Sequence, residues 1–364
     1  AVVTDGPGYN AAMRVVPGCL ACLGVVRLLL LMGLWFAAGC YRWSVLPQGV
    51  VERPLDLQVG KLLQHYTLLS PSPPLPQPIR RPAVVVLHSG FDGDESSAAE
   101  LGRRLASQGV TVVLPAYRGE VRKLDGKRSE GEIEFCHGEV HDALAAVAWL
   151  RQQPGIDPHR VGAIGASHGG CIALVLGERD PQLRALVTLS APVAAEPLLR
   201  YLQERPAETF FYNGILGEQL TSYIKGSPDE LPQAYRDRSP LFQVERLKMP
   251  ILIIHGTADS IVPVAQSCFL AQALRATGRT VSVTTLDSAG RPTQDVVSPC
   301  TPPLPTSNRP SAATTPKTAP RTELLFLEQQ NHIYGTKPRK AAHERALQFL
   351  LTELFEPTPQ AAPQ

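Results

Sequence analysis

The sequence lacks the residue patterns that usually mark a metal centre or a disulfide framework. Its seven cysteines are scattered, and only Cys19 and Cys22, which lie in an apolar N-terminal stretch, form a C-x-x-C pair. No cluster of His, Cys, Asp or Glu has the spacing of metal ligands. We therefore expect no metal, no cofactor and no network of disulfides.

A strong excess of charge of either sign is also missing. The chain has 35 Lys and Arg residues against 33 Asp and Glu residues, which leaves a net charge of +2. Proteins that bind nucleic acid usually present a basic surface, so we do not expect nucleic acid as a partner. With 364 residues, 44% of them hydrophobic, the chain is long enough for one large domain with appendages.

No uninterrupted apolar run has the length of a membrane-spanning helix, and the run at residues 28–38 instead suits a signal peptide. Residues 37–40 resemble the lipobox of bacterial lipoproteins, with Cys40 as the lipidated residue. If residues 15–41 act together, a membrane anchor is the alternative. We interpret residues 1–40 as a leader and expect an exported or membrane-associated protein, with a cytoplasmic location and a buried N-terminal helix as the competing interpretations.

From about residue 50 the chain alternates between strand-like and helix-like segments. Strands alternating with helices indicate a mostly parallel sheet that is covered on both faces. We therefore predict a doubly wound α/β domain over residues 50–355, followed by a disordered tail at residues 356–364. The expected strands lie at residues 62–69, 83–87, 110–114, 161–164, 185–189, 251–255 and 323–327, and the expected helices at 96–108, 138–152, 264–277 and 340–354.

The segment 165–169, GASHG, lies between an expected strand and an expected helix. A G-x-S-x-G sequence in that setting is typical of a nucleophile elbow, a cramped turn that presents its serine at a helix N-terminus. By itself the motif also suits an ordinary turn between a strand and a helix. Ser167 is therefore a candidate nucleophile only if an acid, a histidine and an oxyanion donor accompany it.

Two loops supply the acid and the histidine. Asp259 follows the expected strand at 251–255, and His332 follows the one at 323–327, whereas His343 falls within the terminal helix. A carboxylate can hold a histidine in the tautomer that accepts the serine proton. The order Ser167, Asp259, His332 is the order found in α/β-hydrolases.

Residues 88–91, HSGF, come directly after another expected strand, at the sheet edge where ligands bind in open α/β folds. We assign the two oxyanion donors to the backbone N–H groups of Phe91 and His168. We expect His88 to brace the loop and His168 to contribute its amide rather than its ring. A glycine-containing loop without a catalytic role is the alternative.

Together these motifs resemble the α/β-hydrolase superfamily, and more narrowly the catalytic domain of the prolyl oligopeptidase family and its dienelactone-hydrolase-like relatives. The resemblance covers residues 84–354 and rests on YRG at 117–119, GEVHD at 138–142, IDPHRVG at 156–162, GASHGG at 165–170 and HGTAD at 255–259.

The resemblance implies a serine hydrolase that cleaves an ester or amide bond through an acyl-enzyme, without a metal. Its substrates would be small acyl esters or short peptides, so that the enzyme is a serine peptidase or a carboxylesterase. Peptidases of that family usually carry a β-propeller, and the stretch between leader and sheet, about 50 residues, is too short for one. A non-catalytic binding protein with this fold is the alternative, and the oligomeric state is not indicated.

Two segments do not follow the alternating pattern. Residues 191–249 contain helical stretches and aromatic residues, and we expect them to form a small helical cap over the nucleophile. Residues 287–322 are rich in Pro, Ser and Thr, as disordered segments are. Without residues 282–322, Val281 would run directly into Glu323 as a single strand, so this segment is either an exposed insertion or retained non-coding sequence. The aromatic residues of the expected cap are Phe210, Phe211, Tyr212 and Tyr223.

Overall fold

The computed structural model places most of the chain from residue 44 onward. The expected leader, the tail beyond residue 356 and residues 301–319 lie outside the described residues, so those predictions stay predictions. In the part that is described, no helix combines the length and the apolar character that a bilayer crossing requires. The described residues are 44–46, 49–73, 79–90, 95–204, 210–293, 299–300 and 320–356, with side chains omitted at 44–46, 95–97 and 210–215.

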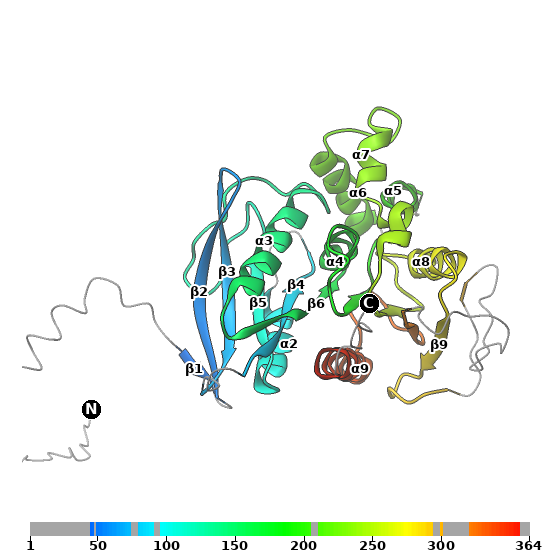
Figure 1. Ribbon diagram of the computed structural model, residues 1–364. Helices are drawn as coiled ribbons and strands as arrows, with labels where there is room; N and C mark the ends of the chain where they lie inside the picture. Colours follow the sequence, from blue (N-terminus) through cyan, green and yellow to red (C-terminus); the bar gives the residue numbers. More distant parts are fainter. Residues whose placement is uncertain are drawn as a thin grey trace, which may run out of the picture. The chain divides into compact units, whose positions relative to one another are not determined.

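Within these residues the strands form one ten-stranded sheet with the order β1-β2-β3-β5-β4-β6-β7-β8-β10-β9 (Figure 1). Three neighbouring pairs are antiparallel, namely β1 with β2, β2 with β3, and β3 with β5. All the other neighbouring strands pair in parallel. This confirms the predicted α/β architecture. The strands are β1 (Ser44–Leu46), β2 (Val50–Val59), β3 (Leu62–Pro71), β4 (Arg81–Leu87), β5 (Thr111–Ala116), β6 (Ile156–Ala166), β7 (Leu186–Leu189), β8 (Ile251–Gly256), β9 (Val281–Leu286) and β10 (Thr322–Leu327).

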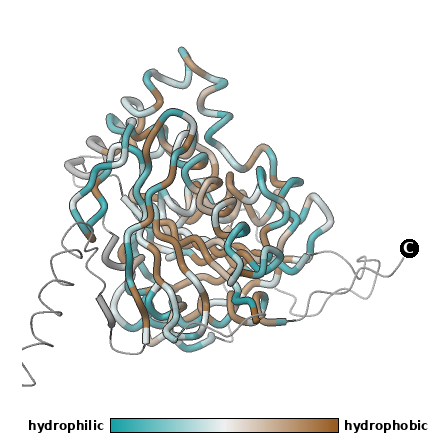
Figure 2. The backbone as a smooth tube through the Cα atoms, turned by 60° about the vertical axis from the view of Figure 1, so that its left-hand side comes forward, coloured by the Kyte–Doolittle hydropathy of each residue, from teal (hydrophilic) through white to brown (hydrophobic). Residues whose placement is uncertain are grey.

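Helices cover both faces of the sheet, and each face has its own apolar core. Helices α3, α4 and α8 pack on one face and α2 and α9 on the other, with apolar strands in the middle of the molecule (Figure 2). A strand that is buried on both faces has a nearly continuous apolar sequence, and β4 and β8 have such sequences. The helices are α2 (Glu95–Ser107), α3 (Gly138–Gln152), α4 (His168–Arg179), α5 (Ala195–Gln203), α6 (Phe210–Ile224), α7 (Pro232–Asp237), the 3₁₀ helix η1 (Pro240–Arg246), α8 (Ala265–Ala276) and α9 (Thr336–Phe355).

The segment between β7 and β8 is helical, as expected for a cap. Its helices α5, α6 and α7 lie together at one end of the domain (Figure 1), and η1 packs against α4 and α8. Tyr223 is partly buried against the core. Phe210, Phe211 and Tyr212 belong to α6, and their side chains lie outside the described residues.

Strands β9 and β10 are neighbours rather than parts of one strand. They run parallel, with Val281 paired to Thr322, and β10 lies between β8 and β9. Beyond β9 the chain turns back so that the Thr293 N–H donates to the Thr285 carbonyl at the outer edge. Most of residues 287–322, which we expect to be disordered, lie outside the described residues, so this expectation stays a prediction.

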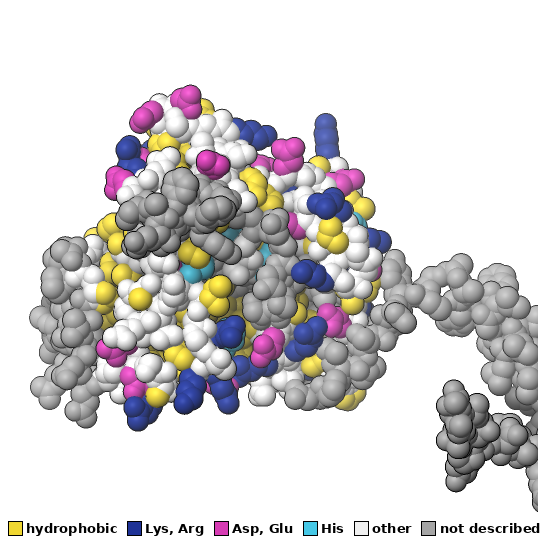
Figure 3. Space-filling view, turned by 180° about the vertical axis from the view of Figure 1, so that it is seen from behind, with side chains coloured by type: hydrophobic (Ala, Val, Ile, Leu, Met, Phe, Trp, Pro, Cys, Tyr) yellow, Lys and Arg dark blue, Asp and Glu magenta, His cyan; other side chains and the backbone are white. Residues whose placement is uncertain are grey.

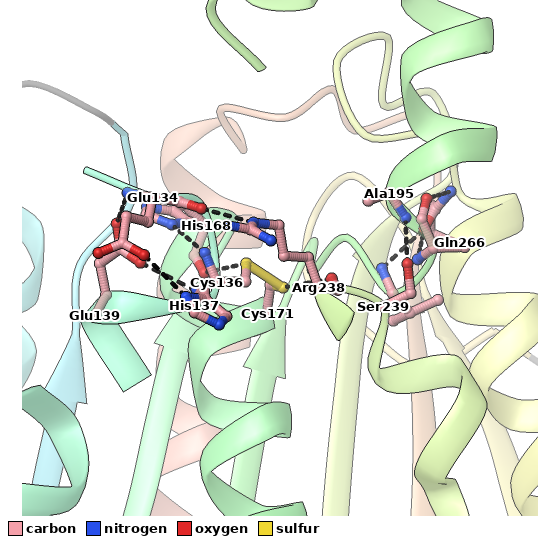
Figure 4. The surroundings of a disulfide bond; sticks show 12 residues. Glu134, Cys136, His137, Glu139, His168, Cys171, Ala195, Arg238, Ser239 and Gln266 are labelled. Carbon is pink, nitrogen blue, oxygen red and sulfur yellow. Dashed lines mark hydrogen bonds and ion pairs between the residues drawn. A yellow bond between two sulfur atoms is a disulfide. The ribbon is translucent and has the colours of Figure 1, made fainter. Parts of the chain in front are cut away.

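The expectation of no disulfide network is wrong, because the described residues contain two disulfides. Cys136 is bonded to Cys171 and Cys268 to Cys300, with Cα–Cα distances of 5.9 and 5.3 Å. The partners are 35 and 32 residues apart in sequence, and each pair joins elements that only the fold brings together. The first links the loop before α3 to α4 (Figure 4), and the second links α8 to the segment that follows β9.

Both signs of charge are distributed over the face of the molecule seen from behind (Figure 3). This mixed surface matches the nearly neutral balance of the sequence.

Candidate active site

Ser167 lies on a sharp turn between β6 and α4, with a positive φ of 52°. A side chain at Gly165 would collide with the Gly169 backbone, and one at Gly169 would collide with the Leu87 carbonyl. Only glycine permits these approaches, which explains the G-x-S-x-G spacing. The Ser167 N–H donates to the Leu189 carbonyl at 2.7 Å, which ties the turn to β7.

The structure brings Ser167, Asp259 and His332 together at the carboxyl ends of β6, β8 and β10. The His332 Nε2 atom lies 2.9 Å from the Ser167 Oγ atom. The His332 Nδ1 atom lies 2.8 Å from the Asp259 Oδ2 atom. These are the contacts of a serine, a general base and an orienting carboxylate.

Asp259 is buried but remains ionised. Burial alone would raise its pKa, whereas hydrogen bonds with His255 and His332 hold the pKa well below its ordinary value. Its Oδ1 atom accepts the N–H groups of Ile261 at 3.0 Å and Val262 at 2.9 Å. The carboxylate is therefore fixed in orientation and keeps a negative charge beside the His332 ring.

The loop that carries Asp259 is held by His255, a role that the sequence analysis did not assign. The buried His255 ring donates from Nε2 to the Val262 carbonyl at 2.8 Å. Its Nδ1 atom accepts the Ser267 hydroxyl at 2.6 Å. The HGTAD segment contained the signal, since a histidine at the end of a buried strand needs polar partners.

The loop that carries His332 is held by its neighbours on both sides. The Asn331 Oδ1 atom accepts the Ser260 N–H at 3.1 Å, and the Tyr334 hydroxyl lies 2.9 Å from the Ser190 Oγ atom in a buried contact. These contacts join the histidine loop to the aspartate loop and to the end of β7. No local pattern in the sequence indicated them, because the partners are far apart along the chain.

Of the two proposed oxyanion donors, the structure describes His168 but not Phe91. Phe91 lies outside the described residues. His168 is the first residue of α4, so its N–H lies at the N-terminus of that helix. His88, expected to brace the loop, has its Nε2 atom 3.1 Å from the buried Glu120 carboxylate, and His343 lies within α9.

In the described part of the chain, no cluster of three or more His, Cys, Asp or Glu residues is arranged to hold a metal ion. The polar contacts of the site come from the side chains and amides named above.

A model of the prolyl oligopeptidase family matches residues 101–290, which is just over half of the 364 residues. Among curated proteins, an uncharacterized peptidase of Bacillus subtilis, YtmA, is 28% identical over 173 residues, covering 47% of this chain and 61% of that protein. The acylamino-acid-releasing enzyme 2 of Oryza sativa is 28% identical over 212 residues, covering 56% of this chain and 26% of that protein. The chain thus spans less than two thirds of these relatives.

Solved structures share the fold at lower sequence identity. An acylaminoacyl peptidase of Pyrococcus horikoshii superposes with a TM-score of 0.57 at 17% identity, covering 88% of this chain and 43% of that one. A putative dienelactone hydrolase of Klebsiella pneumoniae gives a TM-score of 0.51 at 16% identity, covering 83% of this chain and 98% of that one.

Proposed function

The chain belongs to the prolyl oligopeptidase family, and from this premise we propose that it is a serine hydrolase whose catalytic triad is Ser167, Asp259 and His332. The observation that carries the proposal is the continuous contact from Ser167 Oγ through His332 to Asp259, with distances of 2.9 and 2.8 Å. These residues come from three separate loops and meet in the geometry that acyl transfer requires.

The proposed reaction begins when His332 Nε2 removes the Ser167 hydroxyl proton and Oγ attacks the acyl carbonyl of the substrate. Asp259 stabilises the imidazolium that forms. His332 then gives the proton to the leaving alcohol or amine, which leaves an acyl-enzyme on Ser167. Water, with His332 again as the base, releases the acid and restores the serine.

The negative oxygen of the tetrahedral intermediate needs donors that are already in place. The His168 N–H at the start of α4 is one donor in our proposal, and the Phe91 N–H is the other. The helix N-terminus adds a favourable partial charge at the same place.

For substrates we propose short acylated peptides, because the family is one of peptidases and several relatives are acylamino-acid-releasing enzymes. Small acyl esters are the second candidate. The observation that favours them is the likeness to a dienelactone hydrolase, which this fold matches over nearly its whole length. The chemistry at Ser167 is the same for both classes.

The test uses the full chain and a fluorophosphonate probe, which labels an activated serine. We expect labelling of the wild type and none of Ser167→Ala, together with a loss in kcat of about 10³-fold or more on a p-nitrophenyl ester. Ser107→Ala, at the end of α2, serves as the control. Near-normal activity in Ser167→Ala, or a wild type that the probe does not label, would contradict the proposal and favour a binding protein. Comparing acyl-peptide amides with p-nitrophenyl esters then decides the substrate class.

A further inference from the structure

A cavity of about 410 Å³ lies at the edge of the sheet opposite to the triad. It is lined by the first residues of β4, β5 and β6, which are Arg81, Thr111 and Ile156. Leu87, the last residue of β4, pairs with Gly165 of the elbow, so about 20 Å of strand separates the cavity from the proposed nucleophile. Ligand pockets typically measure about 300 to 1,000 Å³. The cavity therefore has room for a small molecule and is separate from the candidate active site.

Much of the lining of this cavity is apolar. Helix α3 packs against β2 (Figure 1), and Trp149 from its last turn lines the cavity together with Val51 of β2 and Leu68 of β3. Ile79, just before β4, also lines it and is 53% exposed. Covering such apolar surface with an apolar ligand removes it from water and is favourable. The lining therefore suits a ligand with an apolar body.

The charged groups of the lining all have the same sign. Arg81 and an arginine of β2, Arg53, line the cavity, and none of its lining residues is acidic. The acidic residues that flank the lining in sequence have basic partners of their own. Glu52 pairs with Arg103 at 3.3 Å, and Asp157 pairs with Arg160 at 2.7 Å. The cavity therefore favours an anion.

Arg81 is the cation best placed to hold that anion. Its Nη2–H group donates to the Pro73 carbonyl at 2.8 Å, and a guanidinium carries several further N–H donors. Burial lowers the pKa of Arg81, and no carboxylate among the described residues raises it. The guanidinium has thus lost part of its hydration without gaining a charged partner from the described part of the chain. An anionic ligand would supply that partner.

We propose that this cavity binds a small monocarboxylic acid with an apolar body, whose carboxylate pairs with Arg81 and whose apolar part covers Trp149 and Ile79. A carboxylate matches the planar fork of a guanidinium, and the hydrogen bonds between them are charge-assisted. The site lies at the amino ends of the strands, whereas the triad lies at their carboxyl ends. Binding there does not depend on the proposed function.

The test titrates the full chain with three probes of one chain length and different head groups, namely octanoate, octan-1-ol and octylamine. Calorimetry gives the stoichiometry and Kd, and Trp fluorescence follows the same titration. We expect one octanoate per chain, and binding of the neutral alcohol that is weaker by about tenfold or more, because it lacks the charged hydrogen bonds to Arg81. The cationic amine should not bind. Octanol or octylamine binding as tightly as octanoate would overturn the inference.

Substitutions then locate the site. Arg81→Met keeps the length of the side chain without its charge and should weaken octanoate binding by about tenfold, with unchanged kcat on a p-nitrophenyl ester. The matched control is Arg80→Met, at an exposed neighbour that does not line the cavity, and it should bind octanoate as the wild type does. Trp149→Phe should abolish the fluorescence change while calorimetry still detects binding. Wild-type affinity in Arg81→Met would overturn the inference.

A second titration separates this cavity from the active site, which could also accept a carboxylic acid. Wild-type chain whose Ser167 has been blocked with the fluorophosphonate should bind octanoate with unchanged Kd, and loss of binding after blocking would overturn the inference. If Arg81→Met does not fold, the comparison of the three probes on the wild type decides the question. A wild type that the fluorophosphonate does not label would contradict the proposed function and leave the octanoate titration unchanged, so the two failures are distinguishable.

Discussion

Asp259→Asn tests the geometry of the triad because the structure determines how an asparagine would sit there. The Asp259 Oδ1 atom accepts the N–H groups of Ile261 and Val262, and only an oxygen can accept at that position. The asparagine Oδ1 atom will therefore remain there, and its NH₂ group will face His332 Nδ1, 2.8 Å from the present Oδ2 position.

A donor at that position reverses the tautomer of His332. Its Nδ1 atom must then be unprotonated in order to accept from the introduced amide, so the proton moves to Nε2, which faces Ser167 Oγ at 2.9 Å. A protonated Nε2 cannot take the serine proton. In serine hydrolases this wrong tautomer lowers kcat by about 10⁴-fold, which corresponds to about 5 kcal/mol of transition-state stabilisation.

The assay is kcat and KM on a p-nitrophenyl ester at pH 7 to 8, with thermal denaturation as the check on folding. We expect the loss in kcat and little change in KM, because Asp259 contacts His332 rather than the substrate. Asp229→Asn, at a side chain that is 93% exposed, is the control. If Asp259→Asn kept kcat within about tenfold of the wild type, the assignment of Asp259 and the reasoning on its two amide donors would both be wrong.

Two further predictions concern stability and the segment between β9 and β10. Burial and the neighbouring Glu245 raise the pKa of Glu178 to about 8, above its unfolded value, so the native state loses stability as pH rises from about 4.5 to 8. Glu178→Gln should therefore raise Tm over the wild type more at pH 8 than at pH 5, and an equal difference at both pH values would contradict this. Deleting residues 282–321, in a chain that also carries Cys268→Ser, joins Val281 to Thr322, which are paired across adjacent strands about 4.8 Å apart. We expect the shortened chain to keep probe labelling and kcat within about twofold, whereas loss of labelling would show that β9 is required.

The candidate triad was predictable because each member follows a strand with a strong local pattern. The runs before Ser167, Asp259 and His332 are short, apolar and bounded by glycine or polar residues. Parallel strands bring their carboxyl ends to one edge, so three separate loops meet there. The order of the three residues along the chain supplied the remaining information.

The contacts around the triad were not predictable in the same way. The Ser190–Tyr334 contact joins residues 144 positions apart, and each disulfide joins elements that are adjacent only after packing. The sequence shows that His168 follows the nucleophile, but the Cys136 N–H that its ring accepts lies on another loop. Such contacts depend on how helices and loops pack, which periodicity along one segment does not describe.

The place of β10 in the sheet has a consequence for how the chain reaches its native state. Thr322 pairs with both Ile251 of β8 and Val281 of β9, so β10 enters between two strands that precede it in synthesis. Strand β10 can take its place only after β8 and β9 have both been made. His332 follows β10, so the proposed general base reaches Ser167 late in synthesis.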